Sequence, residues 1–105
     1  MLKIHDVMLE VIRCMRPLVT AIERCDTQLA RQLRASASSV TLNIAEGGGS
    51  FGGTRRERYR SALGSARETL SNLQTAEAFG YVGALPESVV AGMNQVIGTL
   101  VRVAR

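Results

Sequence analysis

Apolar and polar positions alternate along the chain with the three- and four-residue steps of amphipathic helices. The clearest run begins near residue 4 and continues to residue 22, with Pro17 inside it. Proline lacks a backbone donor and its ring collides with the carbonyl four residues earlier, so we expect a kink or an early stop near Arg16. The apolar face of this helix comprises Ile4, Val7, Met8, Val11, Ile12, Met15, Leu18, Val19 and Ile22.

Three further helices follow from the same periodicity and from signals at their ends. Asp26 can cap a second helix by accepting amides of its first turn, and a run of three glycines ends that helix. Thr54 and Glu57 form a possible capping box for the third helix, and Pro86 suits the first turn of a fourth. We therefore predict helices at approximately 4–24, 27–46, 55–79 and 86–104.

Four amphipathic helices with short connections predict an all-α fold, an antiparallel up-down-up-down four-helix bundle in one domain over residues 1–105. The fourth helix is apolar on more than one side, which favours a homo-oligomer with the fourth helix, the first, or both at the interface. The other predicted core residues are Leu29, Leu33, Ala37, Val40, Ile44, Tyr59, Ala62, Leu63, Ala66, Leu70, Leu73, Ala76, Phe79, Val89, Met93, Val96, Ile97, Leu100, Val101 and Ala104.

A second stripe of mostly small polar residues runs beside the apolar face of the two central helices. In an antiparallel hairpin, residue numbers that face each other sum to about 104, which sets Asn43 level with Ser61 and Ser39 level with Ser65. An enclosed polar group needs a hydrogen-bond partner or costs about 1 to 3 kcal/mol. The pattern predicts a hydrogen-bonded seam within the fold or between subunits, or else a ligand or nucleic-acid site. The seam residues are Ser36, Ser39, Asn43, Glu46, Ser61, Ser65, Glu68 and Asn72, with Gln32 continuing the stripe.

Between the two stripes lies a glycine-rich segment, GGGSFGG, followed closely by four arginines. The segment lacks the Lys and Ser/Thr of a phosphate-binding Walker loop and joins two helices, so it indicates a flexible turn. The arginines stand at a helix N-terminus, which attracts anions. They are either a contact site for a phosphate backbone or a solvated basic turn in which Arg55 or Arg58 pairs with Glu46 or Glu57. The predicted nucleic-acid-binding residues are Arg55, Arg56, Arg58 and Arg60.

The composition narrows the class of protein. The net charge is +4 and twelve of the thirteen basic residues are arginine, which suits a nucleic-acid or acidic protein partner but also follows from genomic base composition.

No apolar run is long enough to cross a membrane, and the N-terminus does not match a secretory signal, so we expect a cytoplasmic protein. Cys14 and Cys25 lie on the first predicted helix and at its exit, about 16 Å apart if this segment is helical throughout, which is too far for a disulfide. They are expected as reduced thiols in or near the core.

Catalytic chemistry is not expected. A di-iron bundle needs two Glu-x-x-His pairs and a serine nucleophile needs a nearby base, yet His5 is the only histidine. The glutamates have simpler roles as caps, seam members or solvated charges. We therefore predict no catalytic residue, no metal site and no cofactor.

Four short segments resemble one family. They are SVTLNIAEG (39–47), YRSALGSARE (59–68), QLRA (32–35) and FGY (79–81). Together they resemble the signature of small four-helix-bundle proteins encoded by intervening sequences within bacterial 23S ribosomal RNA genes, over roughly residues 5–104. The glycine-rich loop departs from the family pattern, which carries more charge there and fewer glycines.

The resemblance implies a ring-shaped homopentamer without enzymatic activity. A related branch, the accessory variability determinant of diversity-generating retroelements, is a basic pentamer that binds a reverse transcriptase and nucleic acid. We therefore expect a non-catalytic homo-oligomer that binds RNA or a ribonucleoprotein through surface arginines. The alternatives are a protein-binding adaptor or reverse-transcriptase accessory, and a small-molecule site along the polar seam.

Overall fold

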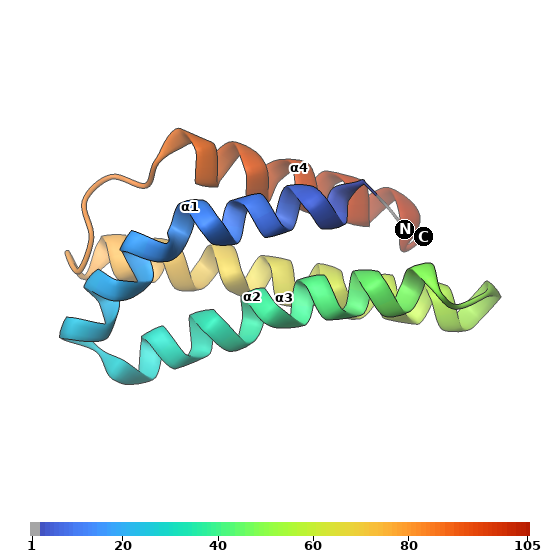
Figure 1. Cartoon of the computed structure of the whole chain (residues 1–105), viewed down its shortest axis with the longest axis horizontal. Coiled ribbons are helices and arrows are strands. Elements are labelled where there is room, and N and C mark those ends of the chain that lie inside the picture. Colours follow the sequence, from blue (N-terminus) through green and yellow to red (C-terminus); the bar gives the residue numbers. More distant parts are fainter. Residues whose placement is uncertain (1–2) are drawn as a thin grey trace.

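The structure is a computed structural model that describes residues 3–105, so the first two residues of the predicted domain lie outside the described part. Residues 3–105 form four α-helices and no strand: α1 (Ile4–Cys25), α2 (Thr27–Gly48), α3 (Gly52–Ala78) and α4 (Glu87–Val103). They lie along the long axis of a molecule that measures 42 × 24 × 19 Å (Figure 1). The all-α fold expected from the hydrophobic periodicity is confirmed.

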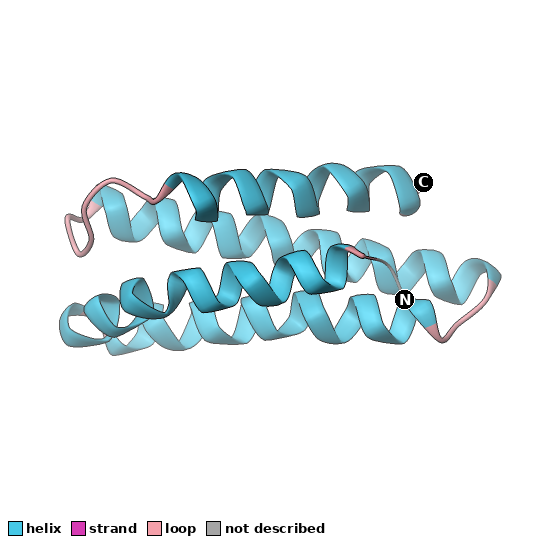
Figure 2. Cartoon of the chain, turned by 45° about the horizontal axis from the view of Figure 1, so that its top comes forward, coloured by secondary structure: helices cyan, strands magenta, loops and turns pink. Residues whose placement is uncertain are grey.

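Each helix packs extensively on two others. α2 contacts α1 and α3, α4 contacts the same two helices, and α2 with α3 form the most extensive pair. The start of α1, the end of α4 and the connection between α2 and α3 lie at one end of the molecule, whereas the longer loop between α3 and α4 lies at the other (Figures 1 and 2). Segments far apart in the sequence therefore meet at the end where α1 begins and α4 ends.

The core is aliphatic apart from the ring of Tyr59, in keeping with a composition that is poor in aromatic residues. Every predicted core position is buried or packs partly buried against the core, with the exceptions of Val101, which is half-buried, and Phe79. Phe79 is 67% exposed and stacks on Tyr81, with 5.2 Å between the ring centroids. The prediction for Phe79 was wrong: it is the cap residue after Ala78, still in helical conformation, and its ring packs on the loop residue Tyr81 and not in the core.

α1 continues through Pro17 to Cys25, so the early stop considered near Arg16 does not occur. The C-terminal part of α1, light blue in Figure 1, runs at an angle to the N-terminal part. Met15 and Ile22, on either side of the proline, are both buried. Packing on both sides therefore holds the helix together where proline removes one backbone hydrogen bond.

The ends of α2 and α3 differ from the predicted ones. The Asp26 cap is confirmed, because its Oδ1 accepts a 2.9 Å hydrogen bond from the Leu29 amide. However, α2 continues to Gly48 and α3 begins at Gly52, so only residues 49–51 connect them. Thr54 therefore lies inside α3, and the predicted capping box with Glu57 was wrong. Gly52 has a φ of +58°, a conformation in which a β-carbon would be strained.

The two cysteines are free, as expected from their separation. Cys14 is half-buried against the core, but Cys25 is exposed at the end of α1, so the core position expected for it was wrong.

None of the four helices within residues 3–105 is long and apolar enough to cross a membrane. Over the same residues, no group of three or more His, Cys, Asp or Glu side chains could hold a metal ion.

Candidate nucleic-acid interface

The first turns of α3 carry the four predicted arginines, all exposed at the end of the bundle where α1 begins and α4 ends. Arg55 closes the turn between α2 and α3. Its Nε donates to the carbonyl oxygens of Ser50 at 2.8 Å and Gly47 at 3.2 Å, and its guanidinium lies 5.7 Å from the centroid of the Phe51 ring. Gly47 lies in the last turn of α2, where its carbonyl oxygen also accepts the Ser50 amide at 3.1 Å, and Ser50 lies in the connection, so Arg55 ties the start of α3 to both.

Arg58 pairs with Glu46 across the α2–α3 hairpin, with 2.9 Å between Nη1 and Oε2. Both side chains are about half exposed to solvent. This pair is one of the pairings that the solvated-turn alternative predicted for Arg55 or Arg58 with Glu46 or Glu57. Because an exposed pair contributes only about 0 to 1 kcal/mol, Arg58 exchanges this partner for another anion at little cost.

Arg60 connects α3 to the end of α4. Its Nε donates to the Ala104 carbonyl oxygen at 3.1 Å. This contact brings the exposed C-terminal residues Arg102 and Arg105 to the same end as the α3 arginines. The sequence interpretation missed these two residues. A signal was available, because the predicted antiparallel bundle places the end of the fourth helix beside the start of the third.

Arg56 is exposed, and within residues 3–105 its guanidinium makes no hydrogen bond or ion pair. It differs in this from the three other arginines of the cluster. Arg55 and Arg60 use Nε to hold carbonyl oxygens, so their terminal NH₂ groups are still available to a ligand. Guanidinium groups bind phosphate oxygens through two parallel hydrogen bonds. The arrangement therefore offers several donors to a polyanion.

The structure brings part of the predicted polar seam together between α2 and α3. Ser39 Oγ lies 2.7 Å from Ser65 Oγ, the pair that the sum of about 104 set level. Asn43 Nδ2 donates to Ser39 Oγ at 3.1 Å, within α2. No hydrogen bond joins Asn43 to Ser61 in the described part of the chain, and Ser61 is exposed.

The deepest part of the seam is centred on Ser36. Its hydroxyl donates to the Leu33 carbonyl oxygen at 3.1 Å and accepts from Thr69 Oγ1 at 2.9 Å and Asn72 Nδ2 at 3.3 Å. Thr69 was missed, because the predicted neighbour of Ser36 was Glu68, one residue earlier and exposed.

The seam serves the packing of α2 on α3. Gln32 and Glu46 are exposed at its edges, and Glu46 is engaged with Arg58. Every buried side-chain polar atom within residues 3–105 has a hydrogen-bond partner. The described seam therefore holds no buried polar group that awaits a ligand.

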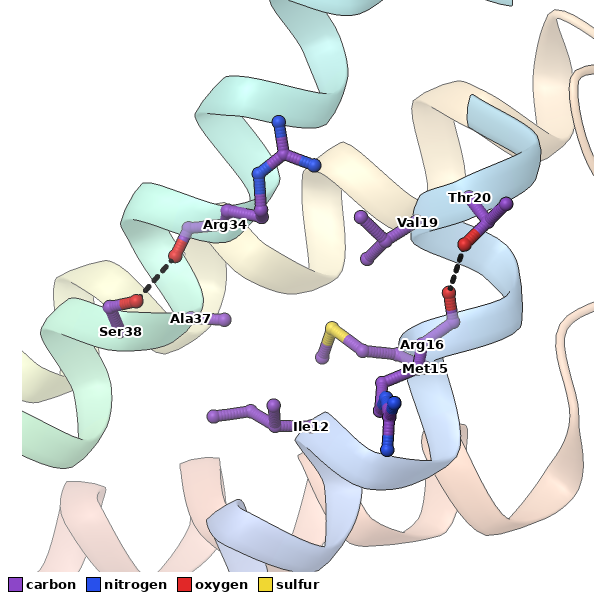
Figure 3. A pocket seen from close by; sticks show the side chains of 8 residues that line it. All are labelled: Ile12, Met15, Arg16, Val19, Thr20, Arg34, Ala37 and Ser38. Atoms are coloured by element: carbon purple, nitrogen blue, oxygen red, sulfur yellow. Dashed lines mark hydrogen bonds between the residues drawn. The ribbon is translucent and has the colours of Figure 1, made fainter. Parts of the chain in front are cut away.

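A cavity of about 380 Å³ lies elsewhere, between α1 and α2. Figure 3 shows Ile12, Met15 and Val19 from α1 and Ala37 from α2 around it. The remaining lining residues are Arg16, Thr20, Arg34 and Ser38. Arg34 is paired with Glu23 at 3.1 Å. This groove is apolar with cationic edges, and it lies outside the predicted seam.

The chain was also compared with known proteins. A family model described as 23S rRNA-intervening sequence protein matches residues 3–99. Searches of curated proteins and of solved structures found no match.

Proposed function

The chain belongs to the family of 23S rRNA-intervening sequence proteins, and from this premise we propose that it is a non-catalytic helical bundle that binds RNA or a ribonucleoprotein through surface arginines. The observation that carries the proposal is the exposed arginine cluster at the start of α3, with the C-terminal arginines of α4 beside it. The binding is to phosphates and is independent of sequence, so its affinity falls steeply with salt.

The geometry of the cluster supports phosphate binding. The Nε bonds of Arg55 and Arg60 to backbone carbonyls restrain two guanidinium groups before any ligand arrives. Restrained side chains lose less conformational entropy on binding than free ones. Arg56 adds a cation without a partner among residues 3–105, and Arg58 one whose partner is easily exchanged.

The proposed assembly is a ring-shaped homopentamer of antiparallel up-down-up-down bundles. Several apolar residues of α4 stay only half-buried in the single chain, among them Ile97, Val101 and Val103. A second subunit would cover them. A ring would repeat the arginine cluster around one rim and raise the local positive potential. Light scattering during size exclusion measures the mass, and a monomer would contradict this part of the proposal.

RNA binding is tested with a double variant, Arg56→Gln with Arg58→Gln, and a fluorescently labelled RNA whose anisotropy is followed at several salt concentrations. These two residues are chosen because neither holds the backbone of another segment. We expect weaker binding and a logarithmic salt slope that is shallower by about 0.7 for each phosphate of a single strand that the variant no longer neutralises.

The matched control is Arg24→Gln with Arg31→Gln, which removes the same charge from exposed positions at the other end of the bundle. The control should bind nearly as the parent does. Equal losses in both variants would show that the cluster is not the site. A parent chain that binds no RNA at low salt would refute the proposed function.

The second candidate function is a protein-binding adaptor, in which nucleic acid is secondary. The groove between α1 and α2 favours it, because its apolar lining and the arginines at its edges fit a helix with an apolar face and acidic flanks. Recovery of one protein partner after nuclease treatment, lost in an Ala37→Glu variant of this groove, would support this candidate. Recovery that is unchanged in the variant would exclude the groove.

A further inference from the structure

Phe51 is the most exposed large apolar side chain of the described residues, with 83% of its surface open to solvent. It stands in the three-residue connection between α2 and α3, beside the arginine cluster. An exposed phenylalanine by itself is ordinary on a protein surface. Its position within a group of cations is what calls for an explanation.

The backbone holds Phe51 in place at the tip of the hairpin. Phe51 is extended, with φ −132° and ψ 152°, and its carbonyl oxygen accepts the Arg55 amide at 3.4 Å. The preceding residue, Ser50, donates its hydroxyl to the Glu46 carbonyl oxygen at 2.7 Å. The next residue, Gly52, has no side chain, and nothing lies within 4 Å of the place where its β-carbon would be. The ring therefore stands on an anchored turn with open space beside it.

The residues around Phe51 are of the kinds that bind a nucleotide. The Arg55 guanidinium lies over the Phe51 ring at 5.7 Å, and Arg56 and Arg58 follow in the first turns of α3. Proteins bind single-stranded nucleic acid with aromatic rings on which bases stack and with cations that follow the phosphates. Since most of the ring stays exposed beside Arg55, a base has access to it.

We propose that Phe51 is a stacking platform for an unpaired base, so that the preferred ligand of the arginine cluster is single-stranded RNA. The inference rests on the RNA binding proposed above and names its substrate class. The ring makes no hydrogen bond, so it accepts any base. In a duplex the bases are already stacked and paired, so that only phosphates reach the arginines.

The test measures the affinity of the full chain for a labelled oligouridine of about 15 nucleotides, within the site size of single-strand binders, and for an RNA duplex of the same length. Phe51→Ala should weaken single-strand binding about 5- to 150-fold, which corresponds to the loss of one stacked base. Affinity for the duplex and the salt slope should stay unchanged, because no charge is removed. Phe79→Ala is the matched control, since Phe79 is an exposed aromatic at the other end of the bundle.

A second readout follows stacking directly. The chain has no tryptophan, so Phe51→Trp introduces a single indole. Its fluorescence should be quenched by single-stranded RNA and much less by duplex, whereas Phe79→Trp should respond to neither.

The outcomes separate the two proposals. If the unsubstituted protein binds neither the single-stranded RNA nor the duplex, the proposed function itself is refuted. A parent that binds RNA while Phe51→Ala changes neither affinity refutes only the stacking platform. Equal losses for single strand and duplex in Phe51→Ala would also overturn it, because the ring would then act only through the shape of the turn.

Discussion

The ring of Tyr59 on α3 lies against the backbone of Gly47 on α2, in the space that a β-carbon at position 47 would occupy. Tyr59 is buried, and Arg55 on the same helix donates to the Gly47 carbonyl oxygen. The two helices therefore approach closely next to the turn that carries the arginine cluster. Because Gly47 has no side chain, the start of α3 packs directly against the backbone of α2.

Gly47→Ala is expected to destabilise the protein by about 1 to 3 kcal/mol, because the added methyl overlaps the Tyr59 ring. This loss exceeds the gain in helix propensity, about 1 kcal/mol. Urea unfolding followed by circular dichroism measures the change. In the control, Gly64→Ala on α3, the added methyl meets nothing within 4 Å, so the protein should gain about 0.5 to 1 kcal/mol. Stabilisation by both substitutions would contradict the close approach.

Ser36→Ala is expected to cost about 1 to 3 kcal/mol of stability. The Ser36 hydroxyl is the common partner of Thr69 and Asn72, and its removal leaves buried polar groups without that bond. Ser38→Ala is the control, because Ser38 is exposed and its hydroxyl bonds only the Arg34 carbonyl within its own helix. The control should change the free energy of unfolding by less than about 0.5 kcal/mol. Equal effects would show that the seam adds nothing to the packing of α2 on α3.

Tyr81 ties the loop before α4 to the start of α2, with its hydroxyl 3.4 Å from Asp26 Oδ2. Burial, followed by the charge of Asp26 and the hydrogen bond to it, raises the pKa of Tyr81 above its ordinary value of about 10. The folded state therefore favours the protonated hydroxyl. This contribution to stability is complete below about pH 10 and is lost as the pH rises through the raised pKa.

Stability measured between about pH 8 and pH 11 should accordingly fall more steeply for the parent than for Tyr81→Phe, which has no proton to lose at this position. Identical pH profiles for parent and variant would mean that the bond to Asp26 does not contribute.

Glu46→Gln should raise RNA affinity because it releases Arg58 and removes a negative charge beside the cluster. One additional neutralised phosphate should steepen the logarithmic salt slope by about 0.7 for a single strand. Stability should fall by no more than about 1 kcal/mol, since the pair is exposed. Glu23→Gln, which releases Arg34 at the remote α1–α2 groove, is the control. An equal gain in the control would indicate a general charge effect without a role for Arg58.

The periodicity of the chain determined four helices and nearly all of their buried faces. The Asp26 cap was readable because a helix N-terminus and its capping side chain are neighbours in the sequence. Even the contact of Ser39 with Ser65 followed from the sequence, because the hairpin has a short turn and helices have a constant rise. The helices and the cap are local properties that a few adjacent residues specify, and the contact of Ser39 with Ser65 adds only the regular geometry of a helical hairpin.

Only the tertiary structure decided where α2 and α3 end and which groups meet at the end of the bundle. α2 extends to Gly48 and α3 begins at Gly52, next to the place where Tyr59 packs on Gly47 and Arg55 holds the Gly47 carbonyl. Arg60 reaches Ala104, forty-four positions away, only after α4 has packed beside α3. The free energy of such contacts depends on segments that are distant in the chain, so no local pattern specifies them.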